Sequence, residues 1–461
     1  MAKRKKSADN IPAIDVLEQI NLHAAGLDIG SEEIYACVPA DRDEQSVRVF
    51  PTFTVDLHAL ADWLAACQIE TVAMESTGVY WIPVYEILES RGFEVYLVNA
   101  RHVKNVPGRK TDVLDCQWIQ QLHTYGLLRA SFRPPAEICS LRALARHRDN
   151  LIRYRSAHIQ HMQKALQLMN VKLTQVVSDI TGKTGMSIIR SILDGERDPK
   201  LLARHRHAQC KRSEAEIAKA LEGNYQPEHL FVLRQAVAQY DFYLQQMQEC
   251  DAEMEARYAA LALSGPDDLA SPPPKPKRAK RRKNQPHFDL ATSLYQMVGV
   301  DLTAIDGLDA LTVQDIISEI GIDVSPWPTA KHFASWLGVA PHTDITGGKV
   351  LRSRTKKTKN RANTALRLAA QSLARSQSAS GAFYRRIRAR QGPAKAVTAT
   401  AHRLARIIYR MLKYREAYVD PGADYFEQQL RARALRNLKR RAAILGMDLL
   451  PTEAPKPLVS Q

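Results

Sequence analysis

The stretch Gly108-Arg-Lys-Thr-Asp-Val-Leu-Asp-Cys-Gln-Trp-Ile119 places two aspartates three residues apart. In a helix this spacing sets Asp112 and Asp115 on one face, one turn apart. Thr111 stands directly before the first aspartate, where a helix N-cap is expected. Two like charges on one helix face repel each other, which favours a cation shared between them. The alternative is that both are solvated first-turn residues favoured by the helix dipole.

Length, charge and cysteine content limit the class of protein. The 461 residues are enough for roughly two to four domains with hydrophobic cores. The 65 Lys and Arg residues against 49 Asp and Glu residues give a net charge of +16, which suits DNA or RNA as a partner. No apolar run reaches transmembrane length, and the N-terminus has no secretory signal pattern, so we expect no membrane partner. The six scattered cysteines are typical of reduced thiols in a cytoplasmic protein.

The N-terminal third has the pattern of an α/β domain with a mixed sheet, predicted over residues 21–135 after a basic tail at 1–20. Strand-like segments cover residues 24–30, 33–39, 47–53, 71–78 and 94–99. Helical spacing covers residues 56–67 and 83–91, before the helix that carries Asp112.

Two further acids belong to apolar strand-like segments: Asp28 lies in the first and Glu75 in the fourth. A carboxylate in such a place is costly unless it is paired or bound to a metal. One sheet edge can bring these two acids together with Asp112 and Asp115. Hard oxygen ligands suit Mg²⁺, and a pair of such ions suits phosphodiester cleavage.

These four acids, in this order, resemble the DEDD set of an RNase H/RuvC-like nuclease fold. Three local motifs are similar to those of the insertion-sequence transposases related to Piv-type DNA invertases, the bridge-RNA-guided recombinases. These motifs are Leu-Asp-Ile-Gly, Met-Glu-Ser-Thr-Gly and Lys-Thr-Asp-x-x-Asp. The resemblance implies that Asp28, Glu75, Asp112 and Asp115 hold Mg²⁺ near a scissile phosphate. One competitor is local: residues 26–31 also resemble the first phosphate loop of actin-like ATPases and sugar kinases, but the other motifs of that fold are absent from the sequence.

Residues 136–263 are predicted to form a helical, coiled-coil region. Apolar residues recur every seven positions from Ala145 to Leu173, which predicts a long amphipathic helix over 136–175. Residues 214–263 are again mostly helical and are expected to return antiparallel to it. Gly182-Lys-Thr-Gly185 lacks the spacing of a phosphate loop and is interpreted as a turn. The family resemblance implies a dimerisation module here, in a homodimer or homotetramer.

Residues 264–287 form a linker rich in Pro, Lys and Arg. It is either a solvated spacer or an arm that binds nucleic acid through counterion release, and the two interpretations are compatible. Its candidate nucleic-acid contacts are Lys280, Arg281 and Arg282. A mainly helical C-terminal domain is predicted over 288–418, with a helix–hairpin–helix-like segment at 302–311, and a basic helical tail over 419–461.

A second chemical site is predicted in Gly338-Val-Ala-Pro-His-Thr-Asp-Ile-Thr-Gly-Gly-Lys349, which resembles the C-terminal domain of the same family. There, the serine of a Ser-Gly-Gly-Lys segment is the covalent nucleophile. Here that position is Thr346, whose extra methyl group crowds the approach, and Ser353 is the alternative nucleophile. The basic side chains expected to contact nucleic acid nearby are Lys349, Arg352, Arg354, Lys356, Lys357, Lys359 and Arg361. The alternative is a Thr-Gly-Gly hairpin turn beside a solvated basic face.

The predicted function is therefore that of a DNA transposase or recombinase of a bacterial insertion sequence, associated with the nucleoid. The resemblance implies that Thr346 attacks the phosphate and leaves a protein–DNA phosphoester, and that a structured RNA pairs with donor and target DNA. Two alternatives stay open: a metal-dependent junction-resolving nuclease that uses water, and a non-catalytic nucleic-acid-binding protein. A trapped protein–DNA adduct separates the first alternative, and metal-dependent activity separates the second.

Overall fold

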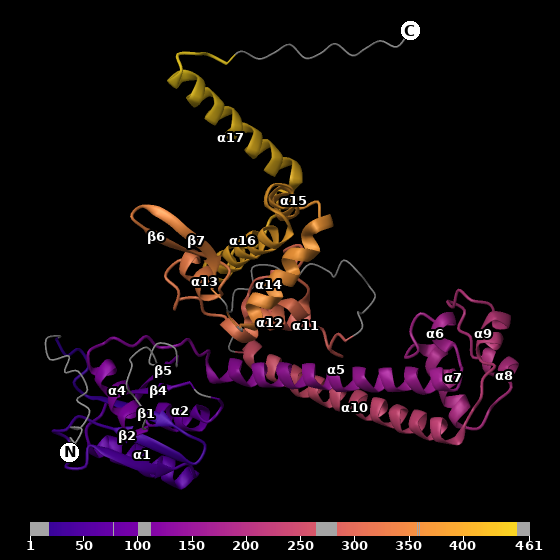
Figure 1. Cartoon of the computed structure of the whole chain (residues 1–461), viewed down its shortest axis with the longest axis horizontal. Helices are drawn as coiled ribbons and strands as arrows, with labels where there is room; N and C mark the ends of the chain where they lie inside the picture. Colours follow the sequence, from indigo (N-terminus) through magenta and orange to yellow (C-terminus); the bar gives the residue numbers. More distant parts are fainter. Residues whose placement is uncertain are drawn as a thin grey trace, which may run out of the picture. The chain divides into compact units, whose positions relative to one another are not determined.

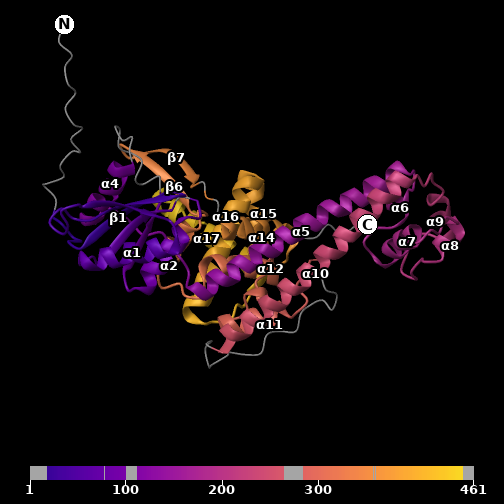
Figure 2. The same ribbon diagram turned by 90° about the horizontal axis from the view of Figure 1, so that it is seen from below.

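The computed structural model describes residues 18–76, 78–99, 112–263, 284–356, 358 and 360–449 (Figures 1 and 2). The chain divides into two compact units, residues 1–133 and 134–461. Six residues singled out by the sequence lie outside the described residues: Thr111, Lys280, Arg281, Arg282, Lys357 and Lys359.

The first unit is built on a five-stranded sheet of strand order β3-β2-β1-β4-β5. The strands are β1 (Ala24–Ile29), β2 (Glu33–Cys37), β3 (Val47–Pro51), β4 (Thr71–Glu75) and β5 (Glu94–Val98). β2 pairs antiparallel with both β1 and β3, whereas β4 pairs parallel with β1 and β5. The mixed sheet expected from the sequence is confirmed, with strand bounds a few residues shorter than predicted.

Helices cover both faces of this sheet because its strands alternate apolar side chains between two cores. On one face α1 (Thr54–Ala66) and α2 (Trp81–Ser90) pack over strand residues such as Leu27 and Met74. On the other face α4 (Asp112–Thr124) packs over Ala73 and Val98 through Trp118, Ile119 and Leu122. Residues at even positions of β1, including Asp28, therefore face α4.

The first half of the second unit contains two long helices, α5 (Ala136–Leu168) and α10 (Pro227–Leu263). They run antiparallel, as predicted. Two contacts show this direction: Arg148 pairs with Asp251, and further along α5 the Tyr154 ring lies 5.7 Å from the ring of Tyr243, which comes earlier in α10. Between them come α6 (Leu173–Val176), α7 (Lys183–Leu193), α8 (Pro199–Ala203) and α9 (Glu214–Ala220). These short helices share a hydrophobic core with the adjoining ends of α5 and α10 (Figure 1).

Two expectations for this region were wrong in detail. The long helix ends at Leu168 and not at residue 175, and Asn170 follows it with a φ of 57°. Gly182–Gly185 is not a turn, because Gly182 is the N-cap of α7 and Gly185 lies inside the helix. A Cβ at Gly185 would lie 2.2 Å from the Ile180 carbonyl oxygen, so close packing explains this glycine.

The remainder of the second unit is mainly helical, as expected. Its elements are α11 (Leu290–Val298), η1 (Leu302–Ala304), α12 (Ala310–Ile320), α13 (Ala330–Trp336), β6 (Pro341–Thr346), β7 (Lys349–Thr355), α14 (Arg361–Ser372), η2 (Leu373–Arg375), α15 (Ala379–Gln391), α16 (Pro393–Tyr414) and α17 (Gly422–Ile444). Asp309 is the N-cap of α12, and its side chain accepts from the Thr312 amide. Among the described residues, no helix is long and apolar enough to cross a membrane.

Candidate active site

A glycine brings helix α4 against strand β1. A Cβ added at Gly26 would lie 2.2 Å from the Gln120 amide nitrogen and 2.5 Å from the Cys116 carbonyl oxygen. The helix backbone therefore rests directly on the strand, which any larger side chain would prevent. Asp28 follows two residues along the same face of β1, so this contact places it beside the first turn of α4.

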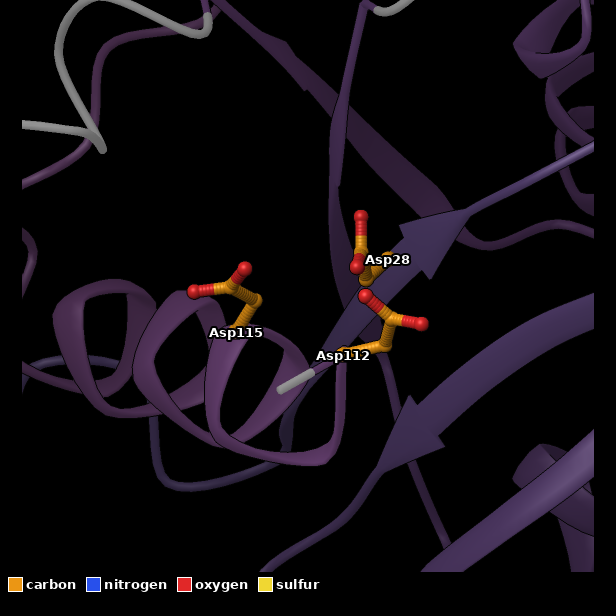
Figure 3. A group of neighbouring side chains, drawn as sticks. All are labelled: Asp28, Asp112 and Asp115. Atoms are coloured by element: carbon orange, nitrogen blue, oxygen red, sulfur yellow. The ribbon is translucent and has the colours of Figure 1, made fainter. Parts of the chain in front are cut away.

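Three of the four predicted acids meet at this point. Carboxylate oxygens of Asp28, Asp112 and Asp115 all lie within 4.8 Å of one another. Figure 3 shows Asp28 on its strand, with Asp112 and Asp115 on the start of α4. Asp28 and Asp115 are partly buried and Asp112 is exposed. The three-residue spacing of the two helix aspartates puts both on the face that meets the strand, as the sequence predicts.

Glu75, the fourth acid, is the last residue of β4 and is buried. The parallel register pairs Leu27 with Met74, and one further step sets Glu75 next to Asp28. Glu75 is not a member of the three-carboxylate group that the described residues form. Its charge still acts on Asp28, so it lies at the edge of the same acidic site.

The cluster is electrostatically unfavourable as it stands. Burial, together with the charges of Asp115, Asp112 and Glu75, raises the pKa of Asp28 to about 6. Like charges held this close destabilise the fold unless a cation neutralises them. A partly buried site that offers several carboxylate oxygens and one open side matches what a divalent cation such as Mg²⁺ requires.

Three neighbours of the acids were not singled out as site residues by the sequence. Gly26 sets the approach of α4, and a glycine inside an apolar strand segment is the signal that could have indicated it. Tyr35 pairs across the strands with Asp28 and shares its face of the sheet. The Cys116 thiol donates to the Val113 carbonyl oxygen at 3.1 Å, and a hydrogen bond with Cys37 together with burial raises its pKa.

The second predicted site is a β-hairpin formed by β6 and β7. Thr346 pairs with Lys349, and the two residues between them, Gly347 and Gly348, have φ values of 55° and 75°. Positive φ at both positions is the type I′ geometry that joins two strands tightly. The hairpin turn named as an alternative is thus the local structure, and it leaves Thr346 exposed at the tip.

The hairpin presents its two candidate nucleophiles on opposite faces. Thr346 lies two residues after Asp344 on β6, so the two side chains share a face. Asp344 pairs with Arg352, and the two side chains form an ion pair on that face. Ser353 pairs with Thr343 instead, and their hydroxyl oxygens lie 3.3 Å apart on the other face. Since the register shift falls on the β7 side, the alternation along β6 is unbroken.

The predicted basic contacts fall into two groups among the described residues. Lys349, Arg352, Arg354 and Lys356 are exposed on or directly after β7. Arg361 differs, because it begins α14 and forms ion pairs with Asp149 of α5 and, at 3.8 Å, with Asp315 of α12. Its position indicates a role in joining helices of the second unit.

Comparison with protein families agrees with both sites. A family model described as a transposase, of the DEDD type of IS110, matches residues 25–171 and so includes the four acids. The model of the transposase IS116/IS110/IS902 family matches residues 301–385, including the hairpin. A search of curated proteins found no match. Both models describe transposases, a class of enzymes that recombine DNA. The chain belongs to the IS110 family of DEDD transposases of insertion sequences.

Proposed function

We propose that this transposase cuts and rejoins DNA strands at a divalent-metal site formed by Asp28, Asp112 and Asp115, with Glu75 beside them. The main support for this proposal is that oxygens of three carboxylates lie within 4.8 Å of one another where α4 packs on β1. The strand order β3-β2-β1-β4-β5, with three antiparallel strands followed by two parallel ones, supports an RNase H/RuvC-like fold for this domain.

The acids would hold Mg²⁺, which supplies positive charge beside the scissile phosphate and its leaving oxygen. The raised pKa of Asp28 is consistent with a group whose ionised form needs a cation. Glu75 is buried at the end of β4, and its charge acts on Asp28, so it would complete the acidic site beside the three aspartates. The hard oxygen donors of these carboxylates favour Mg²⁺ over softer metals.

We assign the nucleophile to Thr346. Its Oγ1 would form a bond to phosphorus as the bond from phosphorus to a deoxyribose oxygen breaks, with the hydroxyl proton lost to solvent and the leaving oxygen protonated from solvent. The product is a protein–DNA phosphoester whose bond energy is retained for rejoining. Its exposure at a Gly-Gly turn lets a DNA backbone approach closely, and Lys349 lies opposite it to offset the developing charge. Ser353 is the alternative nucleophile.

Several partners belong to the same proposal. The resemblance to bridge-RNA-guided recombinases implies a structured RNA that pairs with donor and target DNA, so that the protein reads mainly backbone and shape. It also implies a homodimer or homotetramer, with α5 and α10 as the coiled-coil module and residues 302–311 as a helix–hairpin–helix-like segment.

We place the domain boundaries at 135/136, 263/264, 287/288 and 418/419, and the enzyme at the bacterial nucleoid in the cytoplasm.

The test is a covalent-adduct assay. Purified protein is incubated with Mg²⁺, RNA transcribed from the flanks of its element and end-labelled donor and target DNA, and the products are separated by denaturing electrophoresis. We expect label on the protein, and no labelled protein with Thr346→Ala. Thr346→Ser is the matched control, because it keeps the hydroxyl and removes only the methyl group.

Asp112→Asn tests the metal site in the same assay. We expect this variant to lose cleavage and adduct formation while its nucleic-acid affinity is unchanged, since it replaces one exposed carboxylate by its isostere. Loss of binding in parallel with cleavage would assign Asp112 a structural role. Cleaved DNA without any adduct would favour the second candidate function, a junction-resolving nuclease that uses water, for which the acidic cluster alone would suffice.

A further inference from the structure

A basic cavity on α16 in the second unit is lined by none of the residues of the two predicted sites. It has a volume of about 870 Å³ and is bounded by Pro328–Ala330 before and at the start of α13, by Phe383 of α15, and by one face of α16. The opposite face of α16 is buried through residues such as Leu404 and Ile408. The helix is thus fixed on one side and offers its polar side to the cavity.

The cavity face of α16 carries a row of cations. Arg403, Arg406, Arg410 and Lys413 follow one another at intervals of three or four residues, which places them on one helix face over roughly 15 Å. Among the described residues only Arg410 of this row forms an ion pair, with Glu416 at 3.0 Å. The charge of Asp420 also acts on Arg403, so the exposed Arg406 and Lys413 are the cations of this row that favour a polyanion.

Aromatic rings accompany this row. Tyr414 is 59% exposed and lies with its ring centroid 5.8 Å from the Lys413 ammonium. At the other end Arg403 is held under two rings, 5.4 Å from Phe383 and 5.6 Å from Phe426, and donates to the Ser380 hydroxyl at 3.2 Å. Arg403 is thereby anchored, whereas Arg406 and Lys413 are exposed, and the Lys413 ammonium also donates to the Tyr409 hydroxyl at 3.3 Å.

We propose that this cavity binds a single-stranded nucleic-acid segment, with phosphates along Arg406 and Lys413 and a base stacked on Tyr414. Cationic grooves that follow the backbone, with aromatic platforms for the bases, are how proteins bind single strands. A duplex keeps its bases stacked inside and could use only the cations. The proposal rests on the proposed function only in so far as both involve nucleic acid, because it concerns binding and no chemical step.

The test measures binding by the full-length protein in EDTA, so that a failure of cleavage cannot affect it. The probes are fluorescein-labelled oligouridylate, oligothymidylate and a blunt DNA duplex. We expect Arg406→Gln/Lys413→Gln to bind single strands about tenfold more weakly and to flatten the salt slope by about 0.7 for each lost phosphate contact. Lys219→Gln/Arg234→Gln is the matched control, since both residues are exposed and lie outside the cavity.

Tyr414 separates stacking from charge. We expect Tyr414→Ala to weaken single-strand binding about tenfold without changing the salt slope or duplex binding, and Tyr414→Phe to bind as the parent protein does. Ultraviolet cross-linking to bromouridine-containing RNA or DNA should modify Tyr414, and the probe that cross-links identifies the source of the strand. The proposal is overturned if the double variant binds like its control, or if Tyr414→Ala leaves single-strand binding unchanged in a protein that melts normally.

Discussion

Gly26 of β1 and Gln120 of α4 are in direct backbone contact: a Cβ on Gly26 would lie only 2.2 Å from the Gln120 amide nitrogen. Asp28 lies two residues beyond Gly26 along the strand, and Asp112 and Asp115 lie roughly one to two turns before Gln120 along the helix. The geometry of the acidic cluster therefore depends on a residue without any functional group.

Gly26→Ala should weaken both the fold and the metal site, because the new methyl group must push α4 away from β1. We expect a loss of about 1–3 kcal/mol in the free energy of unfolding, together with weaker binding of Mg²⁺ or Mn²⁺ in titration calorimetry. Ser31→Ala, at an exposed position after the same strand, is the control and should change neither. Normal stability with normal metal affinity would show that the helix can shift without consequence.

Asp28→Asn should stabilise the metal-free protein near pH 7.5 while abolishing cleavage. The pKa of Asp28 is raised to about 6 by burial and by Asp115, Asp112 and Glu75. The folded state therefore binds this proton more tightly than the unfolded chain, and the ionised carboxylate destabilises the fold as pH rises through 6. Allowing for partial exposure, we expect a gain of about 1–2 kcal/mol that disappears below the unfolded pKa of about 4.

This gain is measured by chemical denaturation in EDTA across the pH range. Glu44→Gln, at an exposed position of the same unit, should change stability little at any pH. Added Mg²⁺ should reverse the ranking, because only the parent protein keeps the full ligand set. An Asn variant that is less stable than the parent at pH 7.5 in EDTA would contradict the view that the acids repel one another.

Opposite faces of the hairpin predict opposite results for Thr346 and Ser353. Thr346, the assigned nucleophile, shares its hairpin face with Asp344 and Arg352, whereas Ser353 lies on the other face. Thr346→Ala should therefore abolish adduct formation, and Ser353→Ala should reduce it by less than about threefold. The measurement is the rate of adduct formation under single-turnover conditions. If Ser353→Ala is inactive and Thr346→Ala is active, the nucleophile lies on the other face.

The buried pair of Arg148 and Asp251 should be the most sensitive ion pair of the two long helices. Both residues are at most 2% exposed, and Asp251 also accepts from the His287 amide at 2.9 Å. Asp251→Ala should cost about 3–5 kcal/mol, because it leaves the arginine charged and buried. Asp241→Ala removes the exposed partner of Arg190 from the same helix and should cost less than about 1 kcal/mol.

Urea denaturation of the second unit measures the loss of unfolding free energy in Asp251→Ala and in Asp241→Ala. Replacing the pair by Arg148→Met/Asp251→Leu should recover most of the stability lost in Asp251→Ala, since no unpaired charge is left. A double variant as unstable as the single one would show that the hydrogen bonds to residues 284–287 matter more than the charge pair.

Deletion of residues 272–283 should lower nucleic-acid affinity most at low salt. This segment carries a dense run of Lys and Arg, whose binding would release counterions from the phosphates. A Gly/Ser segment of equal length is the control for chain connection alone. An unchanged slope of affinity against salt concentration would make the segment a plain spacer.

Local pattern determined much of this protein. Short apolar segments indicated the strands of the mixed sheet, and three-residue spacing placed Asp112 and Asp115 on one helix face, because side-chain direction follows from backbone geometry. The heptad pattern indicated the long helix but gave no reason for the buried Arg148 within it. Its partners Asp251 and the Asn284 carbonyl oxygen, both more than a hundred residues away, explain why a charge is buried there.

The tertiary structure decided what no local pattern contains. That Asp28 of β1 meets Asp112 and Asp115 of α4 follows from the contact of Gly26 with α4, and a glycine carries no periodic signal. The separation of Thr346 from Ser353 depends on strand pairing, and the cation row of α16 becomes a cavity only when Phe383 and residues 328–330 pack around it. Residue types and spacings thus supplied the chemical groups, while non-local packing determined which of them share a site, because such contacts join residues that are distant along the chain.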